Sequence, residues 1–328
     1  MKKTKLMIAL LAGLTLGACS NDNDELTPQP KQEPLFPITI EVTETPMTQD
    51  GEEGSDATRS DITTGSSASF TSFYMDYVYG ASNDTGHKTS TRNGDTWTTD
   101  GTWPTDAIST DDEVNWYAHT GGTFNENGGS PYLNFTVDEN VATQHDLLVG
   151  TTSGTYSGTG GKLSFEFNHV CSALRFLIKK STNLNGYKLD VSEVVLCNIL
   201  NHAKYYYATG WSDFYETRSV YTLFSGSQQN LGSGSWIEMD GGSGDYLFLI
   251  PQTLTAWNHT TAIASVTEQT YLKVNCTITN TSTSTQVHSG YAYIPFGYTL
   301  VGNKKYNVKI NIGKNSLFNS SGTLIINP

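Results

Sequence analysis

Leu35-Phe-Pro-Ile-Thr-Ile-Glu-Val42 is the stretch of sequence that indicates the fold of this chain. Within it Ile38, Ile40 and Val42 alternate with polar residues, which is the period-2 pattern of a half-buried β-strand. Two processing signals flank this strand, one on each side. The sequence therefore predicts a first strand that is tethered at one end and removable at the other.

The upstream signal is a secretory leader, residues 1–18. Lys2-Lys3 precede a short apolar core at residues 6–16, which is too short to span a bilayer stably. The leader ends in Leu16-Gly-Ala-Cys19, which resembles the bacterial lipobox, in which the cysteine becomes the lipidated first residue. An ordinary signal peptide cut after Ala18 is the alternative. We expect lipidation of Cys19, with palmitate in its anchor, followed by a solvated tether at residues 20–25.

The downstream signal is Arg59, within Asp56-Ala-Thr-Arg-Ser-Asp61. It is the only basic residue between Lys31 and Lys88, in a polar stretch with the composition of an exposed loop. An incidental surface arginine would have the same appearance. We expect cleavage between Arg59 and Ser60 by an arginine-specific or trypsin-like protease, which makes residues 19–59 a propeptide that carries the first strand.

The composition is that of an all-β surface protein. Charged residues make up 16% of the 328 residues, where about 25% is usual. Serine, threonine, asparagine and glycine supply the polarity, and no long segment has a 3.6-residue apolar period. The net charge of -13 without a basic patch argues against a nucleic-acid partner.

Short alternating segments recur along the chain between clusters of turn residues, as in β-sandwiches. Residues 151–161 are nearly all threonine, serine and glycine, the composition of a flexible linker. We place a domain boundary there, with the N-terminal β-sandwich domain at 60–155 and the C-terminal one at 156–328. Strands are expected at residues 72–80, 113–119, 133–137, 146–149, 163–168, 171–178, 191–200, 246–250, 271–279, 290–295 and 305–312.

The chain ends in a short apolar strand, residues 323–328, that follows a polar spacer. Leu324, Ile325 and Ile326 are its aliphatic residues. This strand could close a sheet of its own chain, or it could add to a sheet edge of another chain.

Motifs of catalysis and of cofactor or metal binding are absent from the sequence: there is no HExxH, G-x-S-x-G, Walker A or GxGxxG. Gly158-Thr-Gly-Gly-Lys162 has the wrong spacing for a phosphate loop, and the acidic cluster at 111–113 lacks calcium-loop spacing. His169 and Cys171 could share one face of a strand, but no third orienting group is evident, and core packing is the better interpretation. We expect no enzyme, cofactor or metal.

Three cysteines lie beyond the leader: Cys171, Cys197 and Cys276. Each occurs in an apolar, strand-like run, so buried thiols are expected, and one disulfide is the alternative. Six tryptophans could stack on sugars if they lined one face, although core packing is the more common role of such residues.

Several motifs, in this order, resemble the fimbrillin family, the FimA-like and Mfa-like type V pilins of Bacteroidetes. They are Trp103-Pro104, Val114-Asn-Trp-Tyr-Ala-His119, His145-Asp-Leu-Leu-Val-Gly150, residues 165–176, Leu249-Ile-Pro-Gln252 and Gly302-Asn-Lys-Lys-Tyr-Asn-Val308. The lipobox and Thr58-Arg-Ser-Asp-Ile62 fit the family's leader. One departure is Cys171-Ser-Ala173, where a second alanine is usual.

The resemblance implies two tandem transthyretin-like β-sandwich domains and no catalysis. It implies an outer-membrane lipoprotein precursor, anchored through Cys19, that loses the strand bearing Ile38, Ile40 and Val42 after cleavage at Arg59. A donor strand from another pilin subunit then fills the groove, and residues 323–327 are the donor candidate here.

The expected function is thus a structural subunit of an adhesive surface pilus, in a homo- or hetero-polymer. Its expected partners are other subunits, the protease and a host or bacterial surface ligand. Two alternatives remain open: a pilus tip adhesin, and a glycan-binding surface lipoprotein that never polymerises and uses the tryptophans as its platform.

Overall fold

The computed structural model of the chain describes residues 36–49, 63–64, 69–228, 230–239 and 246–326, and within these ranges the fold is all-β. Helices are confined to short turns in this part of the chain, and none is long and apolar enough to cross a membrane. They are α1 (Thr105–Thr110), α2 (Tyr156–Thr159) and the 3-10 turns η2 (Val141–Thr143), η3 (Thr182–Leu184), η4 (Ile263–Ser265) and η5 (Lys314–Ser316).

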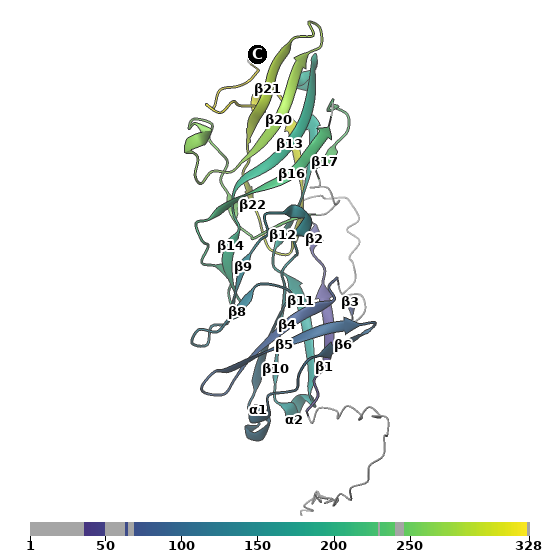
Figure 1. Cartoon of the computed structure of the whole chain (residues 1–328), viewed down its shortest axis with the longest axis vertical. Helices are drawn as coiled ribbons and strands as arrows, with labels where there is room; N and C mark the ends of the chain where they lie inside the picture. The colour runs from purple at the N-terminus through teal and green to yellow at the C-terminus, as the bar shows by residue number, and fades with distance from the viewer. Residues whose placement is uncertain (1–35, 50–62, 65–68, 229, 240–245, 327–328) are drawn as a thin grey trace, which may run out of the picture. The chain divides into compact units, whose positions relative to one another are not determined.

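The first sheet has eight strands and is drawn mostly in purple to teal in Figure 1. In spatial order they are β3 (Thr63–Thr64), β1 (Thr39–Thr45), β11 (Lys162–His169), β10 (Leu148–Gly154), β7 (Val114–His119), β4 (Ser72–Tyr79), β5 (Asp84–Asn93) and β6 (Thr96–Thr99). All neighbouring pairs are antiparallel except β1 and β11, which are parallel.

This sheet curls so that β1 also contacts β6, near the opposite end of the strand order. A bridge between Pro37 and Thr102 continues the closure beyond the strands. The enclosed core is built from alternate residues of each strand, because successive side chains of a strand point to opposite faces. Its buried members include Phe73, Met75, Trp97, Trp103, Val114, Trp116, Leu163, Phe165 and Phe167.

The expected domain boundary between residues 155 and 156 is wrong for this sheet. Strands β10 and β11 are antiparallel neighbours, so the Thr/Ser/Gly-rich segment between them is a connection within one sheet. It forms the one-turn helix α2, capped by the Thr155 hydroxyl, which accepts a hydrogen bond from the N–H of Gly158. The sheet of the first core extends to His169.

The remaining strands form four more sheets within the described ranges. One contains β17 (Ile237–Met239), β12 (Ser172–Lys180), β23 (Lys304–Ile312) and β2 (Thr48–Gln49), with β18 (Leu247–Leu249) also on β12. A second contains β16 (Arg218–Gln228), β13 (Tyr187–Leu200), β20 (Tyr271–Asn280) and β21 (Gln286–Pro295). Smaller sheets contain β15 (Gly210–Ser212), β14 (His202–Tyr206), β9 (Tyr132–Thr136) and β8 (Thr123–Asn125), and the pair β19 (Thr253–Leu254) and β22 (Tyr298–Thr299).

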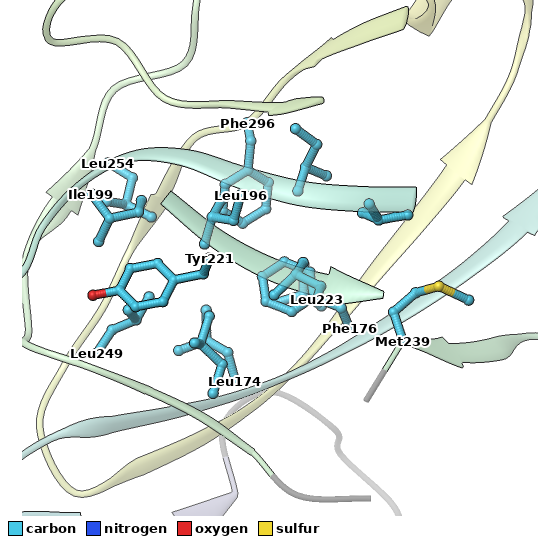
Figure 2. Packing of buried hydrophobic residues seen from close by; sticks show 14 of the residues in the cluster. Leu174, Phe176, Leu196, Ile199, Tyr221, Leu223, Met239, Leu249, Leu254 and Phe296 are labelled. Carbon is cyan, nitrogen blue, oxygen red and sulfur yellow. The ribbon is translucent and has the colours of Figure 1, made fainter. Parts of the chain in front are cut away.

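A second hydrophobic core lies between the sheets that contain β12 and β13. Figure 2 shows Leu174 and Phe176 from β12 facing Tyr221 and Leu223 from β16 and Leu196 from β13. Strand β10 links the two cores, because Leu148 belongs to the first and Val149 to the second.

Candidate functional site

The candidate site is the place of β1 in the first sheet. Its seven residues pair in parallel with β11, from Thr39 opposite Lys162 to Thr45 opposite Asn168. On its other side, within the described ranges, β1 is paired with the two residues of β3. The strand predicted from the sequence is therefore confirmed as a strand, and it lies second from one end of the sheet beside β11 (Figure 1).

Two inward side chains of β1 complete the first core. Ile40 is 7% exposed and Val42 is 2% exposed, and both belong to the cluster that contains Phe165 and Phe167. Ile38 lies before the strand and is half-buried against the same cluster. Full burial of such a side chain contributes about 1.5–3 kcal/mol, so the core is incomplete without β1.

The next inward position of β1 carries a buried carboxylate, Glu44. One of its oxygens, Oε1, lies 3.2 Å from Nε2 of His169 and accepts a hydrogen bond from the Ser69 hydroxyl at 2.8 Å. The other, Oε2, accepts the Ser69 backbone N–H at 2.6 Å. Nδ1 of His169 faces Asp146 on its other side. The inward face of β1 is thus apolar at its start and ionic at its end.

The protonation of this cluster follows from its contacts. Burial alone would lower the pKa of His169, but hydrogen bonds to Asp146 and Glu44 outweigh it and raise the pKa to about 9. Burial likewise favours the neutral acid at Glu44, but the bonds from His169 and Ser69 hold its pKa below the usual value. At neutral pH a buried imidazolium therefore lies between two carboxylates.

Past β1 the same segment adds a second strand to a different sheet. Strand β2 pairs in parallel with the start of β23, and the Thr48 N–H donates to the Asn303 carbonyl at 3.1 Å. The Gln49 side-chain amide donates to the Lys305 carbonyl at 3.1 Å. Residues 36–49 therefore contribute a strand to each of two sheets, next to the end strand of one and at the end of the other. The sequence did not predict β2, because two polar residues carry no period-2 signal.

The residues expected to be processed lie outside the described ranges. These are Cys19, Arg59 and Ser60, so the predicted lipidation and cleavage stay predictions. The chain re-enters the described fold at Ser69, and Phe70 directly anchors it, with its ring 4.7 Å from that of Phe167 between centroids.

The C-terminal segment, expected to be a strand, makes only an isolated bridge between Leu324 and Phe318. The N–H of Ile325 donates to the Leu317 carbonyl at 3.0 Å, and Ile326 is buried in the second core. Phe318 in turn bridges Tyr293 of β21. The predicted strand at 323–328 is wrong for the described part, because the chain turns back at Gly322 and folds onto its own sheet.

The tryptophans do not form a sugar platform. Trp97, Trp103, Trp116 and Trp257 are buried, which leaves only Trp211 and Trp236 half-exposed. The ring of Trp236 is already covered by the Lys179 ammonium, 4.3 Å from its centroid. Four of the six tryptophans thus serve packing, as the core interpretation predicted.

The cysteines are free thiols in the core. Cys171, Cys197 and Cys276 are all buried without a disulfide. Burial raises the pKa of Cys171 well above its ordinary value, and both ring nitrogens of His169 face carboxylates. A thiolate–histidine pair is not formed there. Within the described ranges no cluster of histidine, cysteine or acidic residues is arranged to hold a metal ion.

Sequence reasoning found the aliphatic face of β1 and missed its polar end. Glu44, Ser69 and Asp146 were not singled out, since they are far apart in the sequence and each is a common surface residue type. One signal was present: Glu44 continues the inward series of Ile40 and Val42 at a spacing of two. A carboxylate at an inward position needs a buried partner.

The family model described as fimbrillin-like matches residues 45–327. The chain belongs to the fimbrillin-like family. Among solved structures, a fimbrial protein from Bacteroides vulgatus shares the fold with a TM-score of 0.50 and 17% identity over 73% of this chain and 88% of that one. A candidate cell adhesion protein from Bacteroides uniformis has a TM-score of 0.41 and 14% identity, over 88% of this chain and 96% of that one. No curated protein matches the chain.

Family membership gives the site its context. A fimbrillin-like chain has a fimbrial or adhesive role at the cell surface, and this role is structural rather than enzymatic. The match begins at Thr45, the last residue of β1, and so covers both cores except for the strand that completes the first.

Proposed function

We propose that this fimbrillin-like chain is a structural subunit of an adhesive surface fimbrium, assembled by removal of the N-terminal strand after Arg59 and by strand exchange between subunits. The position of β1 carries the proposal. It fills the first core with Ile40 and Val42, yet it precedes a segment, residues 50–62, that contains a lone arginine. Cutting that segment leaves β1 held only by non-covalent contacts.

Loss of β1 would leave the mature subunit with an unsatisfied surface. Backbone N–H and C=O groups of β11 that now pair with seven residues of β1 would face water or stay unpaired, and apolar side chains would be uncovered. A strand from another subunit restores both the hydrogen bonds and the burial. Because the contact joins two different surfaces head to tail, repetition that does not close gives a filament.

The same cut would open a second edge. Residues 48–49 belong to the released segment, so β23 would lose its neighbour β2 when β11 loses β1. An incoming strand therefore meets two vacated edges, one in each of two sheets.

The donor candidate is the C-terminal segment with Leu324, Ile325 and Ile326. On its own chain it is held by the isolated bridge of Leu324, a backbone hydrogen bond from Ile325 to Leu317, two hydrogen bonds between Thr323 and Asn319, and the burial of Ile326. These contacts are fewer than those of a strand that pairs over seven residues, as β1 does with β11. Release of this segment and its insertion beside β11 of the next subunit would exchange a few contacts for many.

The remaining partners follow from the leader and the cut site. Lipidated Cys19 would anchor the precursor in the outer membrane, and an arginine-specific or trypsin-like protease would release it into a homo- or hetero-polymer. A host or bacterial surface ligand would then be contacted by the fimbrium.

Sequencing the N-terminus of surface-exposed protein tests the processing step. We expect a start at Ser60. Arg59→Ala should abolish polymers and leave a chain whose N-terminus is the lipidated Cys19. Arg59→Lys distinguishes the two classes of protease, because a trypsin-like protease still cuts after lysine and an arginine-specific one does not. Fimbriae built from chains that retain Ile38 would contradict the proposal.

Deleting residues 323–328 tests the exchange step. The secreted protein should fold and be cut at Arg59, but it should no longer form the ladder of high-mass polymers on unboiled gels. Unchanged ladders would show that this segment is not the donor.

A tip adhesin is the second candidate function, and one hollow favours it. About 390 Å³ in volume, it is lined by residues that include Phe214, Tyr215, Glu216, Arg218 and Glu268. The two aromatic side chains are 38% and 39% exposed. Glycan-array binding that is lost in Tyr215→Ala, with polymers capped rather than extended, would support the tip position.

A further inference from the structure

Removal of β1 would also remove one half of a buried ionic cluster. Glu44 is the only part of the cluster on β1; Ser69, Asp146 and His169 stay with the mature subunit. We call Ser69 and His169, with Asp146 behind the imidazole, the acceptor seat. Its free groups would be the Ser69 N–H, the Ser69 hydroxyl and Nε2–H of His169, all of which can donate.

Donors left without an acceptor in a buried place are costly. An unsatisfied buried polar group costs about 1–3 kcal/mol, and a charged one costs more. The side chain of His169 is 11% exposed and that of Asp146 is 9% exposed, so water reaches the seat poorly while a strand covers it. An aliphatic donor strand would fill the core but leave Nε2–H of the buried His169 unpaired, whereas Ser69 is exposed and can bond water.

A second observation shows that the seat is built to receive polar atoms. Beside it lies a hollow of about 480 Å³ whose lining includes Ser69, Phe70, Asp146 and Leu148. The second carboxylate oxygen of Asp146, Oδ1, is buried without a hydrogen-bond partner.

We propose that the acceptor seat sets the register of any strand that replaces β1, by selecting one side chain with an oxygen acceptor. The occupant is the C-terminal segment of a second copy of this chain. In β1, Glu44 follows Val42 by two residues, and in the C-terminal segment Asn327 follows Ile325 by two. Residues two apart share one face of a strand, so both pairs present an aliphatic side chain and then an acceptor.

The chemistry of an asparagine suits the seat. Its carbonyl oxygen accepts from Ser69 and His169, and its NH₂ group donates, which a carboxylate cannot do. It is also neutral, so the charges of His169 and Asp146 compensate each other. The precursor strand, with Glu44, instead places two carboxylates around one imidazolium. The inference rests on the proposed strand exchange and adds a rule for which strand fits and in which register.

The test on assembly uses full-length chains processed in cells, and it reads the amount of polymer ladder. We expect Asn327→Leu to reduce polymer at least tenfold although it adds apolar surface, and Asn327→Asp to keep it within about threefold of native. Thr323→Leu is the matched control and should keep polymer. If deletion of residues 323–328 abolishes polymer but Asn327→Leu does not reduce it, the acceptor rule is overturned and strand exchange stands. If the deletion has no effect, both the donor and this occupant are overturned.

The test on the seat itself needs no polymer. In the uncut Arg59→Ala chain, Glu44→Leu should speed hydrogen exchange of the β1 amides at least tenfold, whereas Glu44→Gln should change it less than threefold. Glu41→Leu is the matched control, since Glu41 lies on the outer face of the same strand, where it contacts the exposed Lys162 and the Ser164 hydroxyl. If the β1 amides of Glu44→Leu exchange as slowly as those of the native chain, the role of the acceptor seat is overturned. An apolar side chain of similar size would then hold the strand as well as an acceptor does.

Discussion

Nε2 of His169 lies 3.2 Å from Oε1 of Glu44, so an ion pair joins the strand proposed for removal to the residue that ends the neighbouring strand β11. Both side chains are about nine-tenths buried. Removal of Glu44 takes one of two carboxylates from His169, which keeps Asp146 as a counter-ion but loses the acceptor at Nε2, and an unpaired buried donor is destabilising. The N-terminal strand therefore contributes both apolar side chains to the core and a carboxylate to His169, and its loss removes both contributions.

The pH dependence of stability should reveal this ion pair. The pKa of His169 is raised from 6.5 to about 9, so its stabilisation is complete below pH 6.5 and is lost as the pH rises through 9. The lowered pKa of Glu44 adds stability that is present above its ordinary value of 4.5 and is lost as the pH falls. We expect the free energy of unfolding of the uncut chain, measured in urea, to be largest between these limits. It should fall by about 3 kcal/mol toward high pH.

A comparison with Glu44→Gln isolates this contribution from other titrating groups. The charged groups that face His169 are Glu44 on β1 and Asp146 before β10. His87 and His119 contact Asp76 elsewhere and are the same in both proteins. Between pH 6.5 and 9 the variant should lose less unfolding free energy than the native chain does. Identical pH profiles would mean that Glu44 does not hold the proton on His169.

The aliphatic half of the β1 site was predictable from sequence, and the polar half was not. Alternation of Ile38, Ile40 and Val42 is a local signal, and burial of the last two follows from it. The contact of Glu44 with His169 depends on the parallel pairing of strands separated by more than 100 residues. A local pattern contains no information on that register.

Other differences have similar causes. Strand β5 is almost wholly polar and escaped prediction, because its order comes from pairing with β4 and not from burial. The segment 151–161 has a linker's composition but connects neighbouring strands, since turns within a sheet use the same residues as linkers. The terminal segment has the composition of a strand, yet it turns back at Gly322 onto Leu317 and Phe318.

The three core cysteines should be unreactive in the native state. Burial raises the pKa of Cys197 to about 11 and of Cys276 to about 12, and it raises that of Cys171 well above its ordinary value. Because the thiolate is the reactive form, we expect negligible labelling by a thiol reagent at pH 8 and labelling of all three in guanidinium. Reduction should change neither the mass nor the stability of the folded chain. A mass gain of two hydrogens on reduction would reveal a disulfide and contradict the free thiols.

Truncation of Ile40 should loosen the N-terminal strand. Ile40→Ala removes a side chain that is 7% exposed and leaves a cavity in the first core, near Leu163, its partner on β11. Such changes cost about 2–5 kcal/mol, and the lower end is expected beside a short strand that can shift. Hydrogen exchange of β1 measures the loss directly. Ile38→Ala, the same change at a half-buried position, is the control and should cost less.

Gly322 holds the C-terminal segment in its docked position. Its φ is +83°, and a Cβ there would overlap the carbonyl oxygen of His259. Gly322→Ala should therefore detach residues 323–326 from Leu317 and Phe318 while both cores stay folded. Hydrogen exchange at Ile325, whose N–H is bonded to Leu317, reports the release. We expect it to rise at least tenfold, because backbone strain and the clash act together.

The matched control is Gly186→Ala, where φ is +86° but a Cβ would meet open space. That variant carries the backbone strain without the clash and should leave exchange at Ile325 unchanged. If residues 323–326 are the donor, the released segment in Gly322→Ala should also assemble faster after cleavage at Arg59, because the docked state no longer competes with insertion. Slower assembly, with Ile325 shown to be free, would mean that the docked hairpin itself is what the neighbouring subunit binds.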